Sequence, residues 1–468
     1  MSAAPEASSA TMRRGACPAL SAPMQTGDGL LVRLNLAEGG MTPGELAALC
    51  DLATRHGNGI VEVTARGSFQ IRGLTPASAR LLEADVSALG LQLREGVPVE
   101  TSPLAGLDPA EASDPLPLVR AIRTAIADVG LSGRLGPKVS VVVDAGGAVD
   151  LSDILADVRL TAVRQDGIAV WHLAIGGNAR TARPLAVLDE HDAVAAVVTV
   201  LEAIAARGMS ARAKDLAPAE MKALFSPSTP RSFAPPSVLP DISPTEGEIG
   251  LLLTSLSSCE VDEWRQPLRQ QISPLVGEMS GRTEGGNVER RTLTELNALQ
   301  LTDGRFAVSV GLPFGSTHAG ELATFLHAIE TNEIRLAPQR SLILICGTEN
   351  AVRAASETAR RAGLILDPAD PRRTIAACPG APACASGRIA TRALARRLAE
   401  RGDLPGSVHV SGCAKGCAHP SPARLVLVGT DAGVALVRDG RAGDAPEMIF
   451  PDADAALAAL AALPEPAE

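Results

Sequence analysis

A distant internal repeat constrains the fold of this chain more than any other feature of its sequence. The order strand, helix, strand, strand is predicted for residues 29–74 and again for residues 306–347. The four-letter phrase GELA occurs in both copies, at residues 44–47 and 320–323. A repeat of this kind predicts two half-domains that pair about a pseudo-twofold axis.

The first copy carries clear local signals. Residues 29–36 alternate as a strand does, and residues 59–74 predict two more strands around a turn. Residues 42–56 predict a helix that has Thr42 as its N-cap and Pro43 at its first position. The corresponding segments of the second copy are residues 306–315, 318–330 and 333–347.

Each half-domain is followed by a longer α/β segment, so the predicted fold class is α+β, with two pseudo-symmetric repeats of half-domain plus α/β domain. A proline-rich stretch at residues 226–244 separates the repeats, and the polar, glycine-rich residues 245–302 indicate a mobile insert. The predicted boundaries are a flexible tail at 1–22, half-domain 1 at 23–79, α/β domain 1 at 80–212, linker and disordered insert at 213–302, half-domain 2 at 303–368 and α/β domain 2 at 369–468.

Composition disfavours two broad classes of function. The chain has 468 residues, of which 46% are hydrophobic and 21% charged, a balance typical of soluble globular proteins. A net charge of −10 and an aromatic content of 2% argue against nucleic-acid binding, and no apolar run is long enough to span a membrane. Because no signal peptide is visible, we expect a cytoplasmic protein whose eight cysteines are reduced.

Two pairs of cysteines carry the strongest chemical signal. Cys378 and Cys384 are spaced C-x5-C in CPGAPAC, and Cys413 and Cys417 are spaced C-x3-C in CAKGC. Both pairs lie on turns rich in Gly and Pro, which allow the backbone to approach a compact inorganic group. Four thiolates in two pairs predict a 4Fe–4S cluster.

Other interpretations of the four cysteines remain open but fit less well. Zinc sites usually pair their ligands at closer spacing, and disulfides need an oxidising compartment. Four unrelated buried thiols would not need Gly and Pro at both turns. Residues 385–402 predict a helix that begins directly after Cys384 and directs its positive N-terminal end at the thiolates, and residues 407–412 predict a strand that leads to Cys413.

A few polar residues could hold a large anion. Arg66, Gln70 and Arg72 follow at even spacing in TARGSFQIR, so on one strand their side chains would share a face and could clamp carboxylates. The competing interpretation is a solvated strand face. Lys138 in GPKVS is a further candidate, and its competing interpretation is an ordinary surface charge on a loop.

The cysteine pattern resembles the cluster motif of the sirohaem-dependent sulfite and nitrite reductases. This resemblance implies a sulfite/nitrite reductase-like fold with ferredoxin-like half-domains, and by position Cys417 would be the cysteine that bridges cluster and haem iron. TARGSFQIR resembles the motif whose arginine contacts haem carboxylates, which supports Arg66 and Gln70. Lys138 matches the first lysine of a K-x-K pair that serves the substrate anion, but the second position is Ser140.

Longer phrases narrow the resemblance. RRGACPALSAPMQTGDGLLVRL, HGNGIVEVTARGSFQIRGL and GCAKGCAHP together resemble the precorrin-3B synthase family, monooxygenases of aerobic cobalamin biosynthesis. The resemblance implies oxidation of precorrin-3A by dioxygen, with a new hydroxyl and closure of the ring A acetate to a γ-lactone. It also implies an NAD(P)H-linked electron donor, a tetrapyrrole-binding α/β domain 1 and a cluster-bearing α/β domain 2. The flat, carboxylate-edged substrate would occupy the cavity that holds sirohaem in the reductases.

Family members are also expected to carry a mononuclear non-haem iron, whose ligands the spacing does not identify. His419, His172 and Cys17 are weak candidates, and ordinary structural roles are the competing interpretation. Two further functions remain as alternatives. A sirohaem-dependent sulfite or nitrite reductase is disfavoured by Ser140, and a non-catalytic iron–sulfur electron carrier would not need paired half-domains or arginines.

Overall fold

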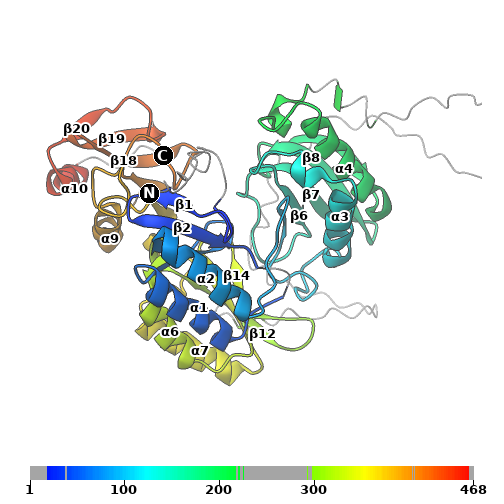
Figure 1. Ribbon diagram of the computed structural model, residues 1–468, viewed down its shortest axis with the longest axis horizontal. Coiled ribbons are helices and arrows are strands. Elements are labelled where there is room, and N and C mark those ends of the chain that lie inside the picture. Colours follow the sequence, from blue (N-terminus) through cyan, green and yellow to red (C-terminus); the bar gives the residue numbers. More distant parts are fainter. Residues whose placement is uncertain are drawn as a thin grey trace, which may run out of the picture.

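The computed structural model describes residues 18–36, 39–217, 220–221, 225, 292–293, 298–402, 404 and 406–462. Four five-stranded sheets organise these residues, one for each predicted half-domain and one for each α/β domain. Figure 1 shows the half-domains together at the lower centre, α/β domain 1 at the right and α/β domain 2 at the upper left. Among the described helices, none combines the length and the apolar character needed to cross a membrane.

The predicted internal repeat is confirmed in the two half-domains. Half-domain 1 comprises β1 (Met24–Thr26), β2 (Gly29–Leu34), α1 (Pro43–His56), β3 (Ile60–Val63), β4 (Phe69–Leu74) and α2 (Pro76–Ala88). Half-domain 2 comprises β10 (Thr292–Leu293), β11 (Ala298–Gln300), β12 (Phe306–Gly311), β13 (Ser316–His318), α6 (Ala319–His327), β14 (Glu333–Ala337), β15 (Ser341–Cys346) and α7 (Glu349–Arg361). Helix α1 begins as predicted, because Thr42 and Glu45 cap its N-terminus reciprocally.

The two half-domains share one core. Helices α1 and α6 pack against each other, and one continuous apolar cluster contains buried residues from both copies. The sheets also exchange backbone contacts, since β13 of half-domain 2 pairs with β3 and Met41 pairs with Ile334. The order β1-β2-β4-β3-β13 therefore ends on a strand from the other repeat.

The two α/β domains have the same topology. Domain 1 comprises β5 (Val99–Thr101), α3 (Leu116–Asp128), β6 (Val141–Asp144), β7 (Ala156–Gln165), β8 (Ile168–Gly177), β9 (Arg183–Leu188) and α4 (Glu190–Ala205). Domain 2 comprises α8 (Pro371–Thr374), β16 (Ile375–Ala377), α9 (Thr391–Arg401), β17 (Val408–Ser411), β18 (Ala423–Thr430), β19 (Gly433–Gly440), β20 (Met448–Phe450) and α10 (Ala453–Ala462). In both sheets the first three strands run parallel to one another. The fourth strand runs antiparallel to the third, and the fifth runs antiparallel to the fourth.

The structure moves three of the predicted boundaries. Helix α2 contacts α1, β2 and β4, so half-domain 1 continues past residue 79. Leu216 and Met221 pack into the core of α/β domain 1, which therefore extends past residue 212. Strand β11 pairs with β12, so its residues belong to half-domain 2 although the insert was predicted to reach residue 302. The tail up to Cys17 and most of the predicted insert lie outside the described residues.

Candidate functional site

Both cysteine turns lie at one edge of the sheet in α/β domain 2. Cys378 directly follows β16, and Cys413 follows β17 after one glycine. These two strands are adjacent and parallel, so their carboxyl ends meet at the same edge. Crevices outside the carboxyl ends of parallel strands are the usual ligand sites of α/β sheets.

Glycines bring the two turns into contact. A Cβ on Gly412 would lie 3.1 Å from the Cα atoms of Gly380 and Gly387, and a Cβ on Gly387 would lie 2.7 Å from the Ala381 nitrogen, so the absence of side chains permits this close approach. The Gly412 N–H donates a hydrogen bond to Sγ of Cys378 at 3.1 Å, and the Arg388 N–H donates to the Gly412 carbonyl. The four-cysteine site is therefore built from two turns that support each other.

The four thiols influence one another electrostatically. Burial raises the pKa of the Cys417 thiol, and the neighbouring Cys413, Cys378 and Cys384 raise it further. Such mutual repulsion disfavours four free thiolates and favours a bound cationic group that pairs with their charge. Within the described residues, no three His, Cys, Asp or Glu side chains converge closely enough to hold a single metal ion.

A buried histidine beside this site has no partner for its ring. His409 on β17 is fully buried, and neither ring nitrogen makes a hydrogen bond within the described residues. Its ring lies 5.8 Å from that of His419 between centroids, and burial, with smaller contributions from His419 and Arg340, lowers its pKa to about 4. An orphaned buried imidazole is consistent with a further bound group in this region.

The predicted helix after Cys384 begins later than expected. Residues 385–390 form a loop, and α9 begins only at Thr391. The hydroxyl of Thr391 donates to the backbone carbonyl of Cys378, so the helix end meets the first cysteine turn through this contact. The prediction that the helix N-terminus directly follows Cys384 was wrong, because Gly387 in this segment forms the close contact with Gly412 described above instead.

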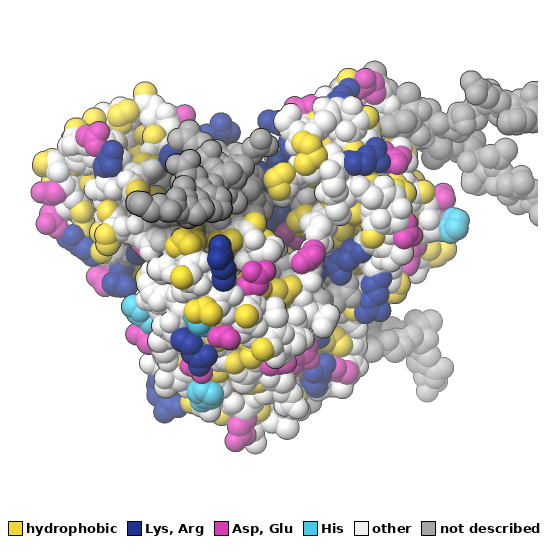
Figure 2. Space-filling model, viewed as in Figure 1, with side chains coloured by type: hydrophobic (Ala, Val, Ile, Leu, Met, Phe, Trp, Pro, Cys, Tyr) yellow, Lys and Arg dark blue, Asp and Glu magenta, His cyan; other side chains and the backbone are white. Residues whose placement is uncertain are grey.

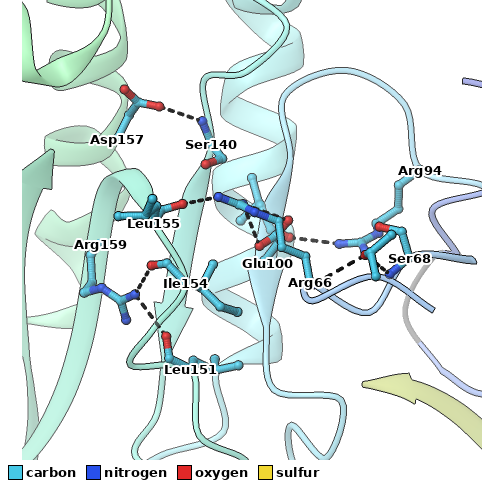
Figure 3. A network of polar contacts seen from close by, with 12 residues as sticks. Arg66, Ser68, Arg94, Glu100, Ser140, Leu151, Ile154, Leu155, Asp157 and Arg159 are labelled. Atoms are coloured by element: carbon cyan, nitrogen blue, oxygen red, sulfur yellow. Dashed lines mark hydrogen bonds and ion pairs between the residues drawn. The ribbon is translucent and has the colours of Figure 1, made fainter. Parts of the chain in front are cut away.

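The structure separates the residues predicted to share one strand face. Arg66 lies in the turn before β4, where the Thr64 hydroxyl accepts from the Ser68 N–H, and only Gln70 and Arg72 are on the strand. The Arg66 guanidinium donates to both oxygens of Glu100, at 3.0 and 3.2 Å, and to the Leu155 carbonyl. Figure 3 shows that it reaches from half-domain 1 to α/β domain 1.

Gln70 and Arg72 instead face α/β domain 2. Arg72 is 3% exposed and donates to Asp28 at 2.7 and 3.0 Å and to the Ala383 carbonyl at 3.3 Å. It also pairs with Glu62, which binds Arg392 of α9 as well. The amide of Gln70, in its favourable orientation, donates to Glu62 and accepts from Arg33. These contacts hold half-domain 1 against the cysteine-bearing domain.

Lys138 and Ser140 lie in the loop before β6. Lys138 is exposed, whereas Ser140 is buried and donates its N–H to Asp157 at 3.1 Å. Neither residue lines the cavity that contains Arg66.

Arg66 lines a cavity of about 410 Å³ between the half-domains and α/β domain 1. Five arginines and two carboxylates are the charged residues of its described lining: Arg66, Arg94, Arg120, Arg123, Arg335, Glu100 and Asp114. Arg94 and Arg123 donate to the Val99 carbonyl, and Arg335 donates to the Pro103 carbonyl. Arg335 is also paired with Glu333 at 2.6 Å, and Arg66 is paired with Glu100 at 3.0 Å. Because the lining holds five arginines against two carboxylates, its net charge is positive.

Sequence reasoning missed four of these arginines. They come from a loop, from α3 and from β14, which are far apart in the chain, and only the Arg66 motif gave a local signal. Elsewhere on the face shown in Figure 2, basic and acidic side chains are interspersed and form no broad basic patch.

The remaining metal-ligand candidates are scattered. His172 is on β8 of α/β domain 1, where burial lowers its pKa, whereas His419 follows the second cysteine turn. Cys17 lies outside the described residues. The described residues therefore do not assemble the predicted ligand set for a mononuclear iron.

Comparisons with known proteins agree with this architecture. The model of the nitrite/sulfite reductase ferredoxin-like half domain matches residues 22–89, which include all of α2. The solved structure of the NirA protein of Mycobacterium tuberculosis aligns with a TM-score of 0.58 and 18% identity, covering 86% of this chain and 71% of that one. The chain therefore has the predicted sulfite/nitrite reductase-like fold.

Two curated relatives span most of the chain. The ferredoxin–nitrite reductase of Synechococcus elongatus is 22% identical over 421 residues, covering 85% of this chain and 76% of the relative. The precorrin-3B synthase of a Sinorhizobium species is 35% identical over 461 residues, covering 97% of this chain and 89% of the relative. Together with the four-cysteine site, this similarity shows that the chain belongs to the precorrin-3B synthase family.

Proposed function

We propose that this chain is an oxidoreductase that hydroxylates precorrin-3A with dioxygen and closes the ring A acetate to a γ-lactone, in aerobic cobalamin biosynthesis. The observation that carries the proposal is the placement of two different sites in equivalent loops. In α/β domain 2 the loops after the first two strands carry the cysteines, whereas in domain 1 the loop after the first strand lines the arginine cavity. One repeat thus supplies a redox site and the other an anion site.

We assign one 4Fe–4S cluster to Cys378, Cys384, Cys413 and Cys417. When bound, the cluster supplies single electrons for the oxidation. The chain contributes four thiolates and at least one backbone donor, because the Gly412 N–H already points at Sγ of Cys378. Hydrogen bonds to a thiolate stabilise its charged form.

We assign the carboxylate edge of the substrate to the arginine cavity. Glu100 and the Leu155 carbonyl hold the Arg66 guanidinium in place, and the other arginines add positive charge around it. A carboxylate moved out of water needs such cationic partners. The contacts of Arg72 support a different role, given below, and substrate contacts by Gln70 and Lys138 stay predictions.

The reaction balances with two electrons from outside. One oxygen atom of dioxygen adds to a carbon–carbon double bond of the macrocycle and becomes the hydroxyl by taking the proton of the ring A acetate, whose oxygen bonds to the second carbon and closes the lactone. The other oxygen atom leaves as water after accepting two electrons and two protons. An NAD(P)H-linked donor is the source of the electrons in this proposal. No step is assigned to a mononuclear iron, because the described residues do not assemble its ligands.

The test starts from protein purified and reconstituted without oxygen. We expect iron and sulfide in equal amounts and a broad, weak visible spectrum. Incubation with precorrin-3A, a reductant and oxygen-18-labelled dioxygen should give a product that carries one labelled oxygen atom, as mass spectrometry would show. The Cys413→Ala variant is the negative control.

The nitrite reductase relative makes a sirohaem-dependent reductase the second candidate. Strong sirohaem absorption bands, with reduction of nitrite or sulfite and no oxygen incorporation into precorrin-3A, would replace the proposal with this candidate. Ser140 at the second position of the K-x-K pair disfavours it, since a small anion needs the missing cation.

A further inference from the structure

The turn between β1 and β2 lies directly on the first cysteine turn. A Cβ built on Gly27 would sit 2.0 Å from the Ala385 nitrogen and 2.3 Å from the Cα of Cys384. Real side chains do not approach a backbone so closely. Any residue other than glycine at this position must therefore push the turn and the backbone of Cys384 apart.

A buried ion pair fixes this contact on its other side. Asp28, next to Gly27, accepts two hydrogen bonds from Arg72 and further ones from Asn58 and the Thr26 hydroxyl. Burial alone would raise the pKa of Asp28, but these hydrogen bonds and the charge of Arg72 outweigh it and lower the pKa. The Nη2 of Arg72 that binds Asp28 also donates to the Ala383 carbonyl, one residue before Cys384.

We propose that Gly27, Asp28 and Arg72 form a latch that positions the Cys384 turn for its redox group. Gly27 limits the turn from one side, and Arg72 holds it through the Ala383 carbonyl. In this proposal Arg72 and Gly27 are positioning residues. The statement that the latch positions Cys384 for a cluster rests on the function proposed above, whereas the contacts that hold the Cys384 turn do not depend on that function.

The latch also joins the two sites along one segment. Arg66, in the cavity, and Arg72, on the cysteine turn, are separated by six positions of the same turn and strand. At about 3.3 Å per residue, an extended segment of this length keeps the two residues at most roughly 20 Å apart. The latch therefore fixes the position of the Cys384 turn relative to the proposed substrate cavity.

Two variants and one matched control test the latch. Gly27→Ala adds a methyl group where there is no space, and Arg72→Lys keeps a positive charge but loses the paired donors that bind Asp28. Gly320→Ala adds the same methyl group on helix α6, where a Cβ meets nothing within 4 Å. Melting temperature of the full-length chain reports any general loss of stability.

The first readout needs no cluster. In metal-free, reduced protein, the alkylation rate of Cys384 by iodoacetamide is measured by peptide mass spectrometry, with an added cysteine-containing peptide as the standard. We expect Gly27→Ala to raise the Cys384 rate on the order of tenfold, the effect of losing contacts worth a hydrogen bond to a charged group. The Gly320→Ala control should keep the parent rate at Cys384.

The second readout is the reconstituted protein. We expect Gly27→Ala and Arg72→Lys to shift the midpoint potential and the electron paramagnetic resonance spectrum of the reduced cluster, which a remote structural defect would leave unchanged. Parent-like alkylation in both variants would overturn the latch. Failure of the parent chain to take up iron and sulfide would overturn the proposed function, while the alkylation rates would still decide the latch. If Gly27→Ala does not fold, the Cys384 alkylation rate of Arg72→Lys alone tests the latch.

Discussion

The two α/β domains share one topology and differ in what their loops carry. In domain 2, the loops after β16 and β17 bear all four cysteines. In domain 1, the loop after β5 and the start of α3 line a cationic cavity, and no cysteine is present between residues 51 and 258. The sheet provides equivalent edges, and loop sequence alone decides the chemistry at each edge.

The comparison also separates two ways of using arginine. Arg66, on the domain 1 side, keeps one face toward a cavity although Glu100 holds it. Arg72, on the domain 2 side, is saturated by two carboxylates and a carbonyl and has no access to solvent. Residues only six positions apart thus serve binding on one side and positioning on the other.

The largest effect should follow removal of one cysteine from domain 2. Cys413→Ala should abolish cluster assembly and oxygen incorporation, because three thiolates leave one iron without a protein ligand. Iron and sulfide analysis after anaerobic reconstitution measures cluster assembly. Cys50→Ala, in the core of half-domain 1, is the control and should retain both metal and activity. A full complement of iron in Cys413→Ala would contradict the assignment of the redox site to domain 2 and the anion site to domain 1.

A smaller effect is expected on the domain 1 side. Arg66→Ala should weaken anaerobic binding of precorrin-3A about tenfold to hundredfold, since a hydrogen bond to a charged group is worth roughly 1.5–3 kcal/mol. Arg66→Lys should recover only part of the lost binding affinity, because the point charge of an ammonium does not replace the two donors with which a guanidinium binds a carboxylate. The cluster spectrum should not change in either variant.

The control for this experiment is Arg180→Ala. Arg180 belongs to α/β domain 1, and its pair with Asp153 is 74% and 70% exposed, a class of ion pair that contributes little. Equal affinities of Arg66→Ala and Arg180→Ala for the substrate would mean that the arginine cavity is not the binding site.

The smallest effect concerns an acid in the loop after β5. Glu111 is buried, with one oxygen unpartnered among the described residues and the other accepting from the Gly106 N–H. Burial, with smaller contributions from the nearby Asp108, Asp114 and Asp144, raises its pKa from 4.5 to about 8, although the Gly106 hydrogen bond acts in the opposite direction.

The folded chain therefore holds this proton more tightly than the unfolded chain does. Its contribution to stability is complete below the unfolded pKa of 4.5 and is lost as pH rises toward about 8. Glu111→Gln removes this dependence, so its stability relative to the parent should grow over that interval, by at most about 1.4 kcal/mol per pH unit. Urea unfolding at several pH values measures this difference in stability. Glu202→Gln, at an exposed position, is the control. A constant difference between Glu111→Gln and the parent would show that Glu111 is ionised in the fold.

The sequence predicted those parts of the molecule that local patterns determine. Thr42 and Pro43 marked the start of α1, alternating side chains marked β2, and GELA revealed the repeat. The four cysteines were found because their spacing and their glycines are local signals. Contacts across long sequence distances left no such mark, so the boundary inside α2 and the late start of α9 were missed.

The candidate anion site shows the same limit. Even spacing suggested one strand face for Arg66, Gln70 and Arg72, but Gly67 turns the chain with a positive φ and places Arg66 outside β4. The arginines contributed by α3 and β14 share the cavity only because the fold brings those elements together. The glycine against Cys384 could not be recognised either, because its partner is more than 350 residues away.

During synthesis, half-domain 1 leaves the ribosome long before its sheet can be completed. The last strand of that sheet, β13, follows β3 by about 250 residues. At about 5–20 residues per second, the missing strand arrives on the order of tens of seconds later. Until then the outer edge of β3 offers unpaired backbone groups to any neighbouring chain. The nascent protein is therefore most exposed to misassembly in mid-translation, and slower translation of the segment between the repeats would lengthen that exposure.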